Sequence, residues 1–550
     1  MRIRMVSLED GITSCGFRKM AAYVARLNRD TEAYYVTTNR YRTITNALGG
    51  TRGAGGGLSD DEVDEVAHGL TGCDLIGFSS MTGYAGLTRR IAGRVRELDP
   101  SIYIVWGGIH PIIHPEDAIT APVDAICTGE GEFAFEEFFE AFKDGRDHTG
   151  VKNFWFKDGS GKITRNQFLP LMSSDEMETL PFPIYRENEQ IYRPGEGFQP
   201  TTLRDYVLND GISYVAIWSI GCPFHCTYCG NTAFIANDKL YKRIRHPSAR
   251  YVVDQIKDVR RRSPHVGHVS FQDDSFMAIP YPQLQEFAEL WKAELDLPFA
   301  VYGVIPNYVK QDKFELLTWA GMNRIRMGIQ SGSERILEFY KRPSPPAKIR
   351  AAGEVIGSLT PEHHLPAVYD LIVDNPIETR QDVVDTLQLM YEMPRPYTLL
   401  IYSLKVIPNT ELEKAMKELG VDLDMIDNSY LVIPPRAGNL LLYLLCLVRP
   451  PKWMWKLLLR RVRASGEPQK LYPRLGLVLR FLYLSKRVLP HLRRMEFSIM
   501  PGWAGWAAWR IGLTGLWRRR FTRRLPRPET PAKWASAPPV AVSVEVLESR

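Results

Sequence analysis

The sequence predicts an α/β protein with two parallel-sheet domains followed by a helical extension. Three observations indicate this. Short apolar runs alternate with helical patterns up to about residue 145, the alternation resumes near Tyr214, and a basic, aromatic composition begins near Arg436. Strands that alternate with helices are typical of doubly wound sheets and β/α barrels. A chain of 550 residues also exceeds what one core usually holds.

Residues 1–145 are expected to form a doubly wound parallel sheet. Ser59 and Glu62 have capping-box spacing, which predicts a helix running to about His68. In such sheets the ligand lies at the carboxyl ends of the strands. The expected strands are Ile3–Val6, Ala33–Val36, Asp74–Phe78, Tyr103–Trp106 and Val123–Ile126, and the expected helices include Phe17–Leu27, Leu87–Leu98 and Phe133–Phe142.

Prolines interrupt residues 146–205, which are interpreted as a linker with a hairpin. Residues 206–425 then repeat a strand–helix unit six times, which favours a partial (β/α)6, TIM-like barrel with its active site at the strand C-termini. The helices include Tyr251–Arg261 and Asp312–Ala320, and the strands are Tyr214–Ser219, Val266–Phe271, Phe299–Val304, Arg324–Ile329, Ala367–Val373 and Leu399–Lys405.

Residues 426–525 are predicted to be a basic helical extension, and residues 526–550, rich in Pro and Ala, a disordered tail. Between Arg436 and Leu525 there are 20 Lys and Arg but two acidic residues, so the rest of the chain carries a net −12. Trp503, Trp506, Trp509 and Trp517 recur there at near-helical intervals.

This composition suits a helix lying in an anionic membrane interface, so we expect peripheral membrane contact through residues 436–525. No uncharged apolar run reaches the roughly 18 residues that a spanning helix needs. The alternative is a helical bundle with core tryptophans. Nucleic acid is unlikely as a partner because no fold module for it is recognisable. The N-terminus carries no secretory pattern, so a cytoplasmic protein is expected, at most peripheral at the inner face of the cell membrane.

Seven cysteines, an odd number spread thinly, do not suggest a disulfide framework. Three of them, Cys222, Cys226 and Cys229, form a C-x3-C-x2-C motif directly after a predicted strand. Three thiolates in one loop can hold three irons of a 4Fe–4S cube and leave the fourth iron open to a chelating small molecule. A zinc site completed by His225 or a remote ligand, or three free thiols, are the alternatives.

The motif, with Tyr228 before its last cysteine, resembles the radical S-adenosylmethionine (SAM) superfamily. The segments 271–276, 328–334 and 374–379 follow later strands in an order similar to that family, although relatives usually have Glu where Gln330 stands. The resemblance implies that the cysteines hold a 4Fe–4S cluster and that SAM binds its open iron. A donor such as flavodoxin or ferredoxin would supply the electron that cleaves SAM. The residues implied to contact SAM are Tyr228, Gly230, Asp273, Gln330 and Ser331.

Three turns after N-terminal strands, at residues 79–83, 107–111 and 128–132, are rich in small residues and allow a large ligand to approach the backbone. Together they resemble the cobalamin-binding domains that precede some radical SAM domains. Ile12 stands where an axial histidine would be counted from Asp10, so no axial ligand is assigned. The residues implied to line the cobalamin site are Ser79, Thr82, Gly107, Gly108, His110, Gly129 and Gly131.

These resemblances imply a cobalamin-dependent radical SAM methyltransferase that acts on an unactivated carbon, or phosphorus, of a small-molecule or lipid substrate. Methyl transfer would follow hydrogen abstraction by the 5′-deoxyadenosyl radical. A radical cyclisation or rearrangement without methyl transfer is the first alternative. A cobalamin or iron–sulfur sensor is the second.

Overall fold

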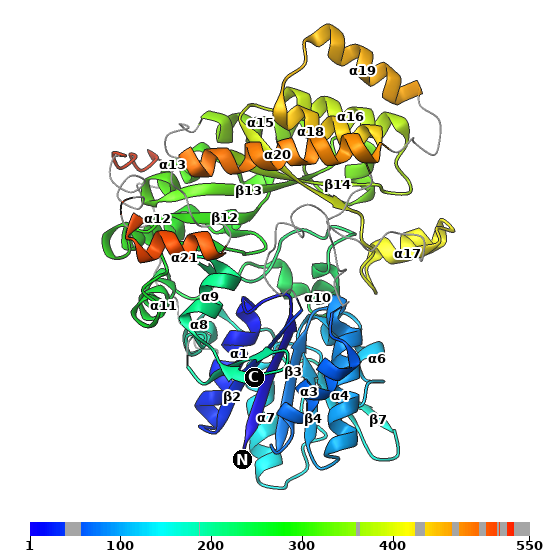
Figure 1. Ribbon diagram of the computed structural model, residues 1–550, viewed down its shortest axis with the longest axis vertical. Coiled ribbons are helices and arrows are strands. Elements are labelled where there is room, and N and C mark those ends of the chain that lie inside the picture. Colours follow the sequence, from blue (N-terminus) through cyan, green and yellow to red (C-terminus); the bar gives the residue numbers. More distant parts are fainter. Residues whose placement is uncertain are drawn as a thin grey trace, which may run out of the picture.

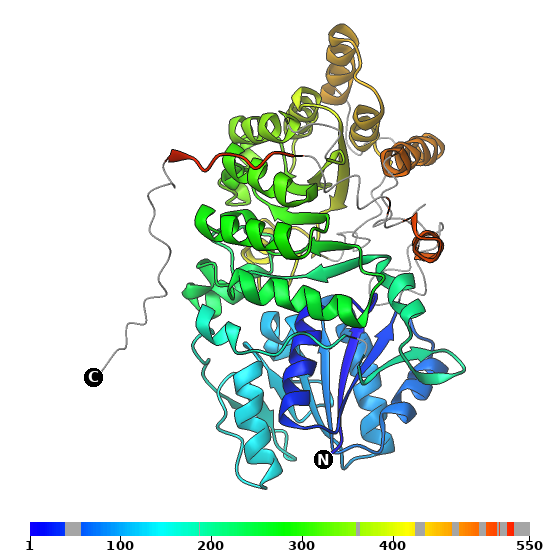
Figure 2. The ribbon, with the colours of Figure 1, turned by 90° about the vertical axis from the view of Figure 1, so that its left-hand side faces the viewer.

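The computed structural model describes residues 1–38, 57–185, 187–358, 364–423, 435–464, 472–493, 502–513, 516 and 525–532. These residues form a nine-stranded sheet, a six-stranded sheet, and helices that cover both (Figure 1). The N-terminal sheet lies at the bottom of Figure 1 and the second sheet above it. Figure 2 shows the same stacking from the side. The predicted α/β class with a helical extension is confirmed.

The N-terminal sheet contains the predicted doubly wound core, with strands in the order β2-β1-β3-β4-β5, all parallel. Its order reverses between β1 and β3, which is the switch point where such sheets bind ligands. The strands are β1 (Ile3–Glu9), β2 (Thr31–Thr37), β3 (Leu75–Ser80), β4 (Tyr103–Gly107) and β5 (Ala125–Cys127).

Residues 146–205 supply both edges of this sheet. Antiparallel strands β6 (Phe154–Lys157) and β7 (Ile163–Arg165) extend it beyond β5. Strand β8 (Glu189–Arg193) pairs parallel with β2, and β9 (Gly197–Pro200) pairs antiparallel with β8. The segment expected to be a linker with a hairpin is therefore an integral part of the N-terminal sheet.

Amphipathic helices cover both faces of the sheet. Helices α1 (Cys15–Leu27) and α7 (Glu132–Lys143) bury Phe17 and Phe138 against one face. Helices α3 (Asp60–Leu70) and α4 (Ala85–Leu98) cover the other face. The predicted capping box is present, since Ser59 accepts from the Glu62 amide and Glu62 from the Ser59 amide.

The second sheet is the predicted partial barrel of six parallel strands in chain order. Outward-facing residues such as Ile325, Tyr369 and Leu399 pack under helices that include α11 (Ala249–Arg262), α13 (Gln311–Ala320) and α16 (Arg380–Glu392). The strands are β10 (Ser213–Ala216), β11 (His268–Phe271), β12 (Phe299–Val304), β13 (Met322–Gln330), β14 (Ala367–Val373) and β15 (Tyr397–Ser403).

The C-terminal extension packs on the barrel through α18 (Ala437–Leu447) and α19 (Lys452–Ala464). Trp455 is buried and stacks on Tyr391 with ring centroids 5.0 Å apart. Helix α20 (Pro473–Arg493) lies along the free edge of β15, where the Tyr483 hydroxyl contacts the Leu399 backbone. No helix among the described residues is long and apolar enough to cross a membrane. Trp517 and the arginines of residues 518–524 lie outside the described part of the chain.

Candidate functional site

The cysteine motif lies in a loop that leaves β10 and is held on both sides by backbone hydrogen bonds. The Cys222 amide donates to the Tyr241 carbonyl at 3.1 Å, and the Thr227 amide to the Tyr340 carbonyl at 3.0 Å. Gly221 has φ +110°, and a Cβ there would lie 2.3 Å from the Arg243 carbonyl oxygen, so only glycine fits. All three cysteines are free thiols; Cys222 and Cys226 are buried and Cys229 is partly exposed.

Asp273 fixes the start of this loop. Its buried carboxylate accepts from the amides of Trp218 and Ser219 at 3.2 and 2.5 Å and from the Ser219 hydroxyl at 2.6 Å. Strand β12 passes close to the Asp273 backbone at Gly303. A Cβ on Gly303 would lie 2.0 Å from the Asp273 carbonyl oxygen, so a larger residue would not fit there. Asp273, implied to contact SAM, is thus occupied by the loop backbone, whereas Asp274 faces a cavity.

Arg342, which sequence reasoning missed, lies against the cysteine loop. Its Nη1 donates to the Tyr228 hydroxyl at 3.1 Å and contacts Cys226 Sγ at 3.8 Å, and its Nη2 donates to the Gly328 carbonyl at 2.5 Å. Nε is buried without a hydrogen-bond partner. An isolated arginine 113 residues beyond Cys229 gives no local signal, so only the fold could reveal it.

The geometry does not favour a mononuclear zinc site. In the described part of the chain, no three His, Cys, Asp or Glu side chains are grouped as a single ion would require. His225 turns toward Glu411, with 3.6 Å between Nδ1 and Oε1. An iron–sulfur cube takes one thiolate per iron, so its three sulfurs need not converge on one point. Burial, and secondarily the charges of Asp274, Cys226 and Cys222, raise the pKa of the Cys229 thiol to about 12, and a bound metal cation would favour the thiolate.

The other residues implied to contact SAM lie at different depths. Tyr228 and Gly230 belong to the cysteine loop and are partly exposed. Gln330 ends β13 with φ +71° and is partly exposed. Ser331 is fully buried, with its hydroxyl 3.2 Å from that of Thr386 on α16. Tyr228 and Gly230 therefore lie together in the cysteine loop, whereas Ser331 is packed beneath α16.

A cavity of about 580 Å³ lies at the carboxyl edge of the N-terminal sheet, at its switch point. Five of the residues implied to line a cobalamin site line this cavity: Ser79, Gly107, Gly108, Gly129 and Gly131. The loop after β1 also contributes to the lining, through Glu9 and residues 13–17, as do Met20 and Glu132. From the sequence, this loop was considered only as the place of a possible axial histidine. Its role in lining the cavity was missed, although it follows the first strand of the sheet.

Thr82 and His110 do not line this cavity. Thr82 starts a short turn before α4, and its hydroxyl is buried. His110 is 2% exposed, stacks on Trp106 at 5.0 Å and bonds Asp117 at 2.9 Å. No histidine is among the described residues that line the cavity, in line with the missing D-x-H motif.

Glycines shape the cavity wall in two ways. A Cβ on Gly108 (φ +89°) would lie 2.9 Å from Ser79 Oγ, so this glycine permits close packing of β4 on β3. A Cβ on Gly16, near the start of α1, would meet no atom within 4 Å. The space beside Gly16 is thus left open for a ligand.

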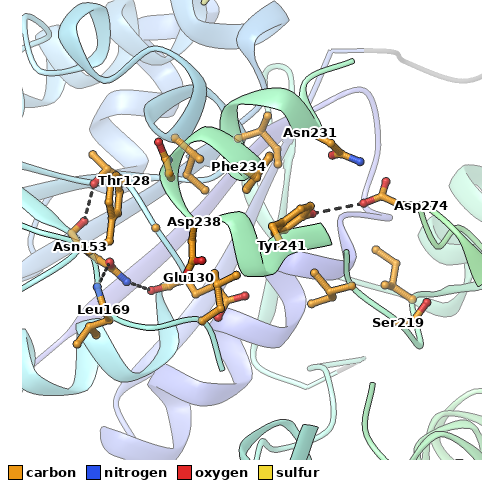
Figure 3. Close-up of a pocket in the computed structure, with 18 of the residues that line it drawn as sticks. Thr128, Glu130, Asn153, Leu169, Ser219, Asn231, Phe234, Asp238, Tyr241 and Asp274 are labelled. Atoms are coloured by element: carbon orange, nitrogen blue, oxygen red, sulfur yellow. Dashed lines mark hydrogen bonds between the residues drawn. The ribbon is translucent and has the colours of Figure 1, made fainter. Parts of the chain in front are cut away.

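A second cavity of about 330 Å³ is lined by Ser219 and Ile220, which precede the cysteine motif, and by Asn231, which follows it (Figure 3). Its walls come from residues 128–130 of the N-terminal sheet and from α10 (Asn231–Asn237), which directly follows Cys229 and Gly230. Asp274 lies at its barrel end and accepts from the Tyr241 hydroxyl at 3.3 Å. Both cavities are lined by Ile109, Ile112, Gly129, Ile217 and Gln272.

Two family models match the chain in these regions. Residues 54–139 match the B12 binding domain and residues 217–390 match the radical SAM superfamily. The first range contains the turns that follow β3, β4 and β5 around the large cavity, and the second contains the cysteine loop. The predicted pair, a B12 binding domain followed by a radical SAM domain, is thus confirmed.

Similar proteins include an uncharacterized methyltransferase of Pyrococcus horikoshii, 24% identical over 59% of this chain and 65% of its own. Cytidylyl-2-hydroxyethylphosphonate methyltransferase of Streptomyces wedmorensis is 27% identical over 52% of this chain and 55% of its own. The chain thus spans less than two thirds of these relatives. Anaerobic magnesium-protoporphyrin IX monomethyl ester cyclase of Synechocystis is 26% identical over 81% of this chain and 88% of its own.

Solved structures of cobalamin-dependent radical SAM enzymes have the same fold. The methyltransferase TsrM from Kitasatospora setae superposes with a TM-score of 0.58 at 15% identity and covers 76% of each chain. OxsB superposes with a TM-score of 0.56 at 15% identity over 95% of this chain and 76% of its own.

The cofactors of this radical SAM family are a 4Fe–4S cluster, SAM and cobalamin, and the sites present suit them. The cysteine loop offers three free thiols within one short segment. The switch-point cavity offers an open space beside Gly16 and a wall of glycines and small residues.

Proposed function

We propose that this protein is a cobalamin-dependent radical SAM methyltransferase. When bound, the cluster with SAM supplies a 5′-deoxyadenosyl radical and cobalamin supplies the methyl group. The protein's residues hold these groups, orient the substrate between them and exclude water. Cobalamin occupies the 580 Å³ cavity and SAM the end of the 330 Å³ cavity near Asp274.

In this proposal Cys222, Cys226 and Cys229 bind the cluster, and Asp273 orients their loop through the Trp218 and Ser219 amides. Arg342 supplies a buried guanidinium beside Cys226, suited to a carboxylate such as that of SAM. The proposal also assigns SAM contacts to Tyr228, which accepts from Arg342 Nη1 at 3.1 Å, and to the partly exposed Gly230 and Gln330. The cobalamin cavity is bounded by Ser79, Gly107, Gly108, Gly129 and Gly131.

The observation that carries the proposal is the shared wall of the two cavities. Ile217 and Gln272 come from the barrel, Ile109 and Gly129 from the N-terminal sheet, and all four line both cavities. A ligand in the large cavity would therefore lie next to the space that leads to the cysteine loop. Methyl transfer to a substrate radical needs this proximity.

Single Cys→Ala changes at positions 222, 226 and 229 test the cluster site. We expect each change to abolish the formation of 5′-deoxyadenosine from SAM by the anaerobically reconstituted full chain. The reason is that the cluster needs all three thiolates as iron ligands. Cys73→Ala, at a buried thiol beneath α3, is the control and should leave cleavage intact. Retained cleavage in a motif variant would contradict the proposal.

Cyclisation without methyl transfer is the second candidate, favoured by the long alignment with the Synechocystis cyclase. SAM labelled with deuterium in its methyl group distinguishes the two. Label in the product supports methyl transfer. Unlabelled product formed with 5′-deoxyadenosine supports cyclisation.

We also propose peripheral contact with anionic membranes through α20. Its exposed residues include Arg474 and Lys486 together with apolar side chains that are more than two fifths exposed. This pairing of basic and apolar surface suits a lipid interface. The exposed apolar residues are Leu475, Leu477, Val478, Phe481, Leu482, Val488 and Leu489.

A further inference from the structure

The 330 Å³ cavity extends beyond the part near Asp274 where SAM is proposed to bind. In Figure 3, Asp274 lies on one side of the cavity, and Leu169 and Asn153 lie on the other. The wall of this cavity also includes several wholly apolar side chains that do not line the large cavity. They belong to Phe168, Leu169, Leu171, Ile220 and Phe234. The proposed cobalamin site therefore leaves these side chains free for another ligand.

The segment that follows β7 and carries three of these side chains is held in place by hydrogen bonds. The Leu169 amide donates to Asn153 Oδ1 at 2.7 Å, and the Met172 amide donates to Glu130 Oε2 at 2.7 Å. The other carboxylate oxygen of Glu130 accepts from Arg245 of the barrel domain at 2.7 Å. The N-terminal sheet and the barrel domain thus fix this part of the wall together.

The polar side chains of the same wall already have hydrogen-bond partners within the protein. Asn153 Nδ2 donates to the Glu130 carbonyl at 2.8 Å, and the Thr128 hydroxyl donates to the Asn153 carbonyl at 3.1 Å (Figure 3). All eight polar residues labelled in Figure 3 have such a partner: Thr128, Glu130, Asn153, Ser219, Asn231, Asp238, Tyr241 and Asp274. A polar ligand on the side of Leu169 would lose its hydration without gaining equivalent hydrogen bonds, whereas a hydrocarbon would not.

Exposed apolar side chains are concentrated at this cavity. Among the described residues up to 423, seven large apolar side chains are exposed, and three of the seven line the 330 Å³ cavity. These three are Ile109, Phe168 and Ile217. Apolar surface that gathers at one opening is typical of a binding site, whereas single exposed apolar residues elsewhere are normal.

We propose that the 330 Å³ cavity binds a hydrocarbon arm of the substrate, an acyl or isoprenoid chain, on the side of Leu169. The inference rests on the proposed function and names its substrate class, a lipid. Ile109 and Ile217 line both cavities, so a chain bound beside Phe168 and Leu171 continues into the space next to cobalamin. Burial of the chain holds the substrate, and its reacting carbon lies toward the large cavity.

Titration calorimetry on the anaerobic holoprotein tests this with 1-octanol, 1-decanol and geraniol as probes. We expect saturable binding that tightens about fourfold for each methylene group added from octanol to decanol, because a buried methylene contributes about 0.8 kcal/mol. Decanol and geraniol have the same number of carbon atoms. The tighter of these two therefore distinguishes a straight acyl chain from an isoprenoid chain.

Phe168→Asp and Leu171→Asn should each weaken decanol binding at least tenfold, because each places a polar group against the chain. Leu240→Asp is the matched control, since Leu240 is 46% exposed and lies next to Tyr241 in the sequence but lines neither cavity. Decanol binding should persist in the presence of saturating SAM. Absence of binding, displacement of decanol by SAM, or binding that both cavity variants leave unchanged would overturn the inference.

SAM cleavage by the wild-type holoprotein is scored separately from alcohol binding. Cleavage without alcohol binding defeats only this inference, and alcohol binding without cleavage defeats only the proposed function.

Discussion

At the scale of single residues, two adjacent carboxylates have different roles. Asp273 is turned inward and accepts three hydrogen bonds from the segment that precedes the cysteines. Asp274 borders the 330 Å³ cavity. The family resemblance implied a SAM contact for Asp273, and in the structure it is the neighbouring Asp274 that faces the cavity.

The Asp273 carboxyl makes folding stability depend on pH. Burial raises its pKa to about 7, whereas in the unfolded chain it is about 3.9. Between those values the folded protein retains a proton that the unfolded chain has lost, so this group's contribution falls as pH rises and is level above about 7. Asp273→Asn does not titrate, so its unfolding free energy should rise relative to wild type across that window.

Urea unfolding of the apoprotein, followed by tryptophan fluorescence at about pH 5 and about pH 8, measures this difference. Asp273→Ala, which leaves three donors unpaired, should lose at least about 3 kcal/mol at both values. A difference between the Asn variant and wild type that does not change with pH would contradict the assignment.

At the scale of elements, the strands and helices were largely predictable and their lateral pairing was not. β12 and β14 match the expected ranges at both ends, because their apolar runs are bounded by turn residues. β8 and β9 were missed because they depend on a partner, β2, that is remote in sequence. The cysteine triad was predictable from spacing. The contact of Arg342 with the cysteine loop became visible only in the folded structure.

Two helices offer a matched test of the cobalamin cavity. Gly16 and Gly86 each occupy the second position of a helix and are exposed, and a Cβ added to either would meet no atom within 4 Å. Only Gly16 lines the large cavity. Gly16→Leu should weaken cobalamin binding about tenfold or more, since overpacking costs about 1–3 kcal/mol. Gly86→Leu should bind as wild type does.

The two variants are compared by the amount of cobalamin bound per chain. It is measured by absorbance after anaerobic reconstitution and desalting. Equal loading of the two variants would show that the space beside Gly16 is not used by the cofactor.

At the scale of the whole molecule, one hydrophobic core joins both sheets and the extension. It contains Phe17 and Phe138 of the N-terminal half, Trp291 of the barrel and Trp455 of α19. Arg245 bridges the halves through Glu130 at 2.7 Å and the Met172 carbonyl at 2.6 Å. In the extension, Trp455 is part of this core, whereas apolar side chains on the outer side of α20 are exposed.

Phe481→Glu tests the proposed lipid contact of the whole protein. Phe481 is 59% exposed, and an acidic residue there should weaken binding to phosphatidylglycerol-containing vesicles about tenfold, from lost apolar burial of about 2 kcal/mol. Leu419→Glu, at a position also 59% exposed but beside α17 (Glu411–Glu418), is the control. Wild-type protein that fails to sediment with such vesicles would refute the contact.

The edge strands contributed by residues 146–205 bear on how such proteins can be recombined. Glu189 on β8 accepts from the hydroxyls of Tyr35 and Tyr206, and Arg18 lies 4.6 Å from the Tyr185 ring centre. Grafting residues 1–145 alone into a relative would cut through this buried group and strip β2 of its neighbour. The unit to exchange between relatives is therefore residues 1–210, and chimeras joined after α9 (Leu203–Asp210), which contains Tyr206, should keep the N-terminal half intact.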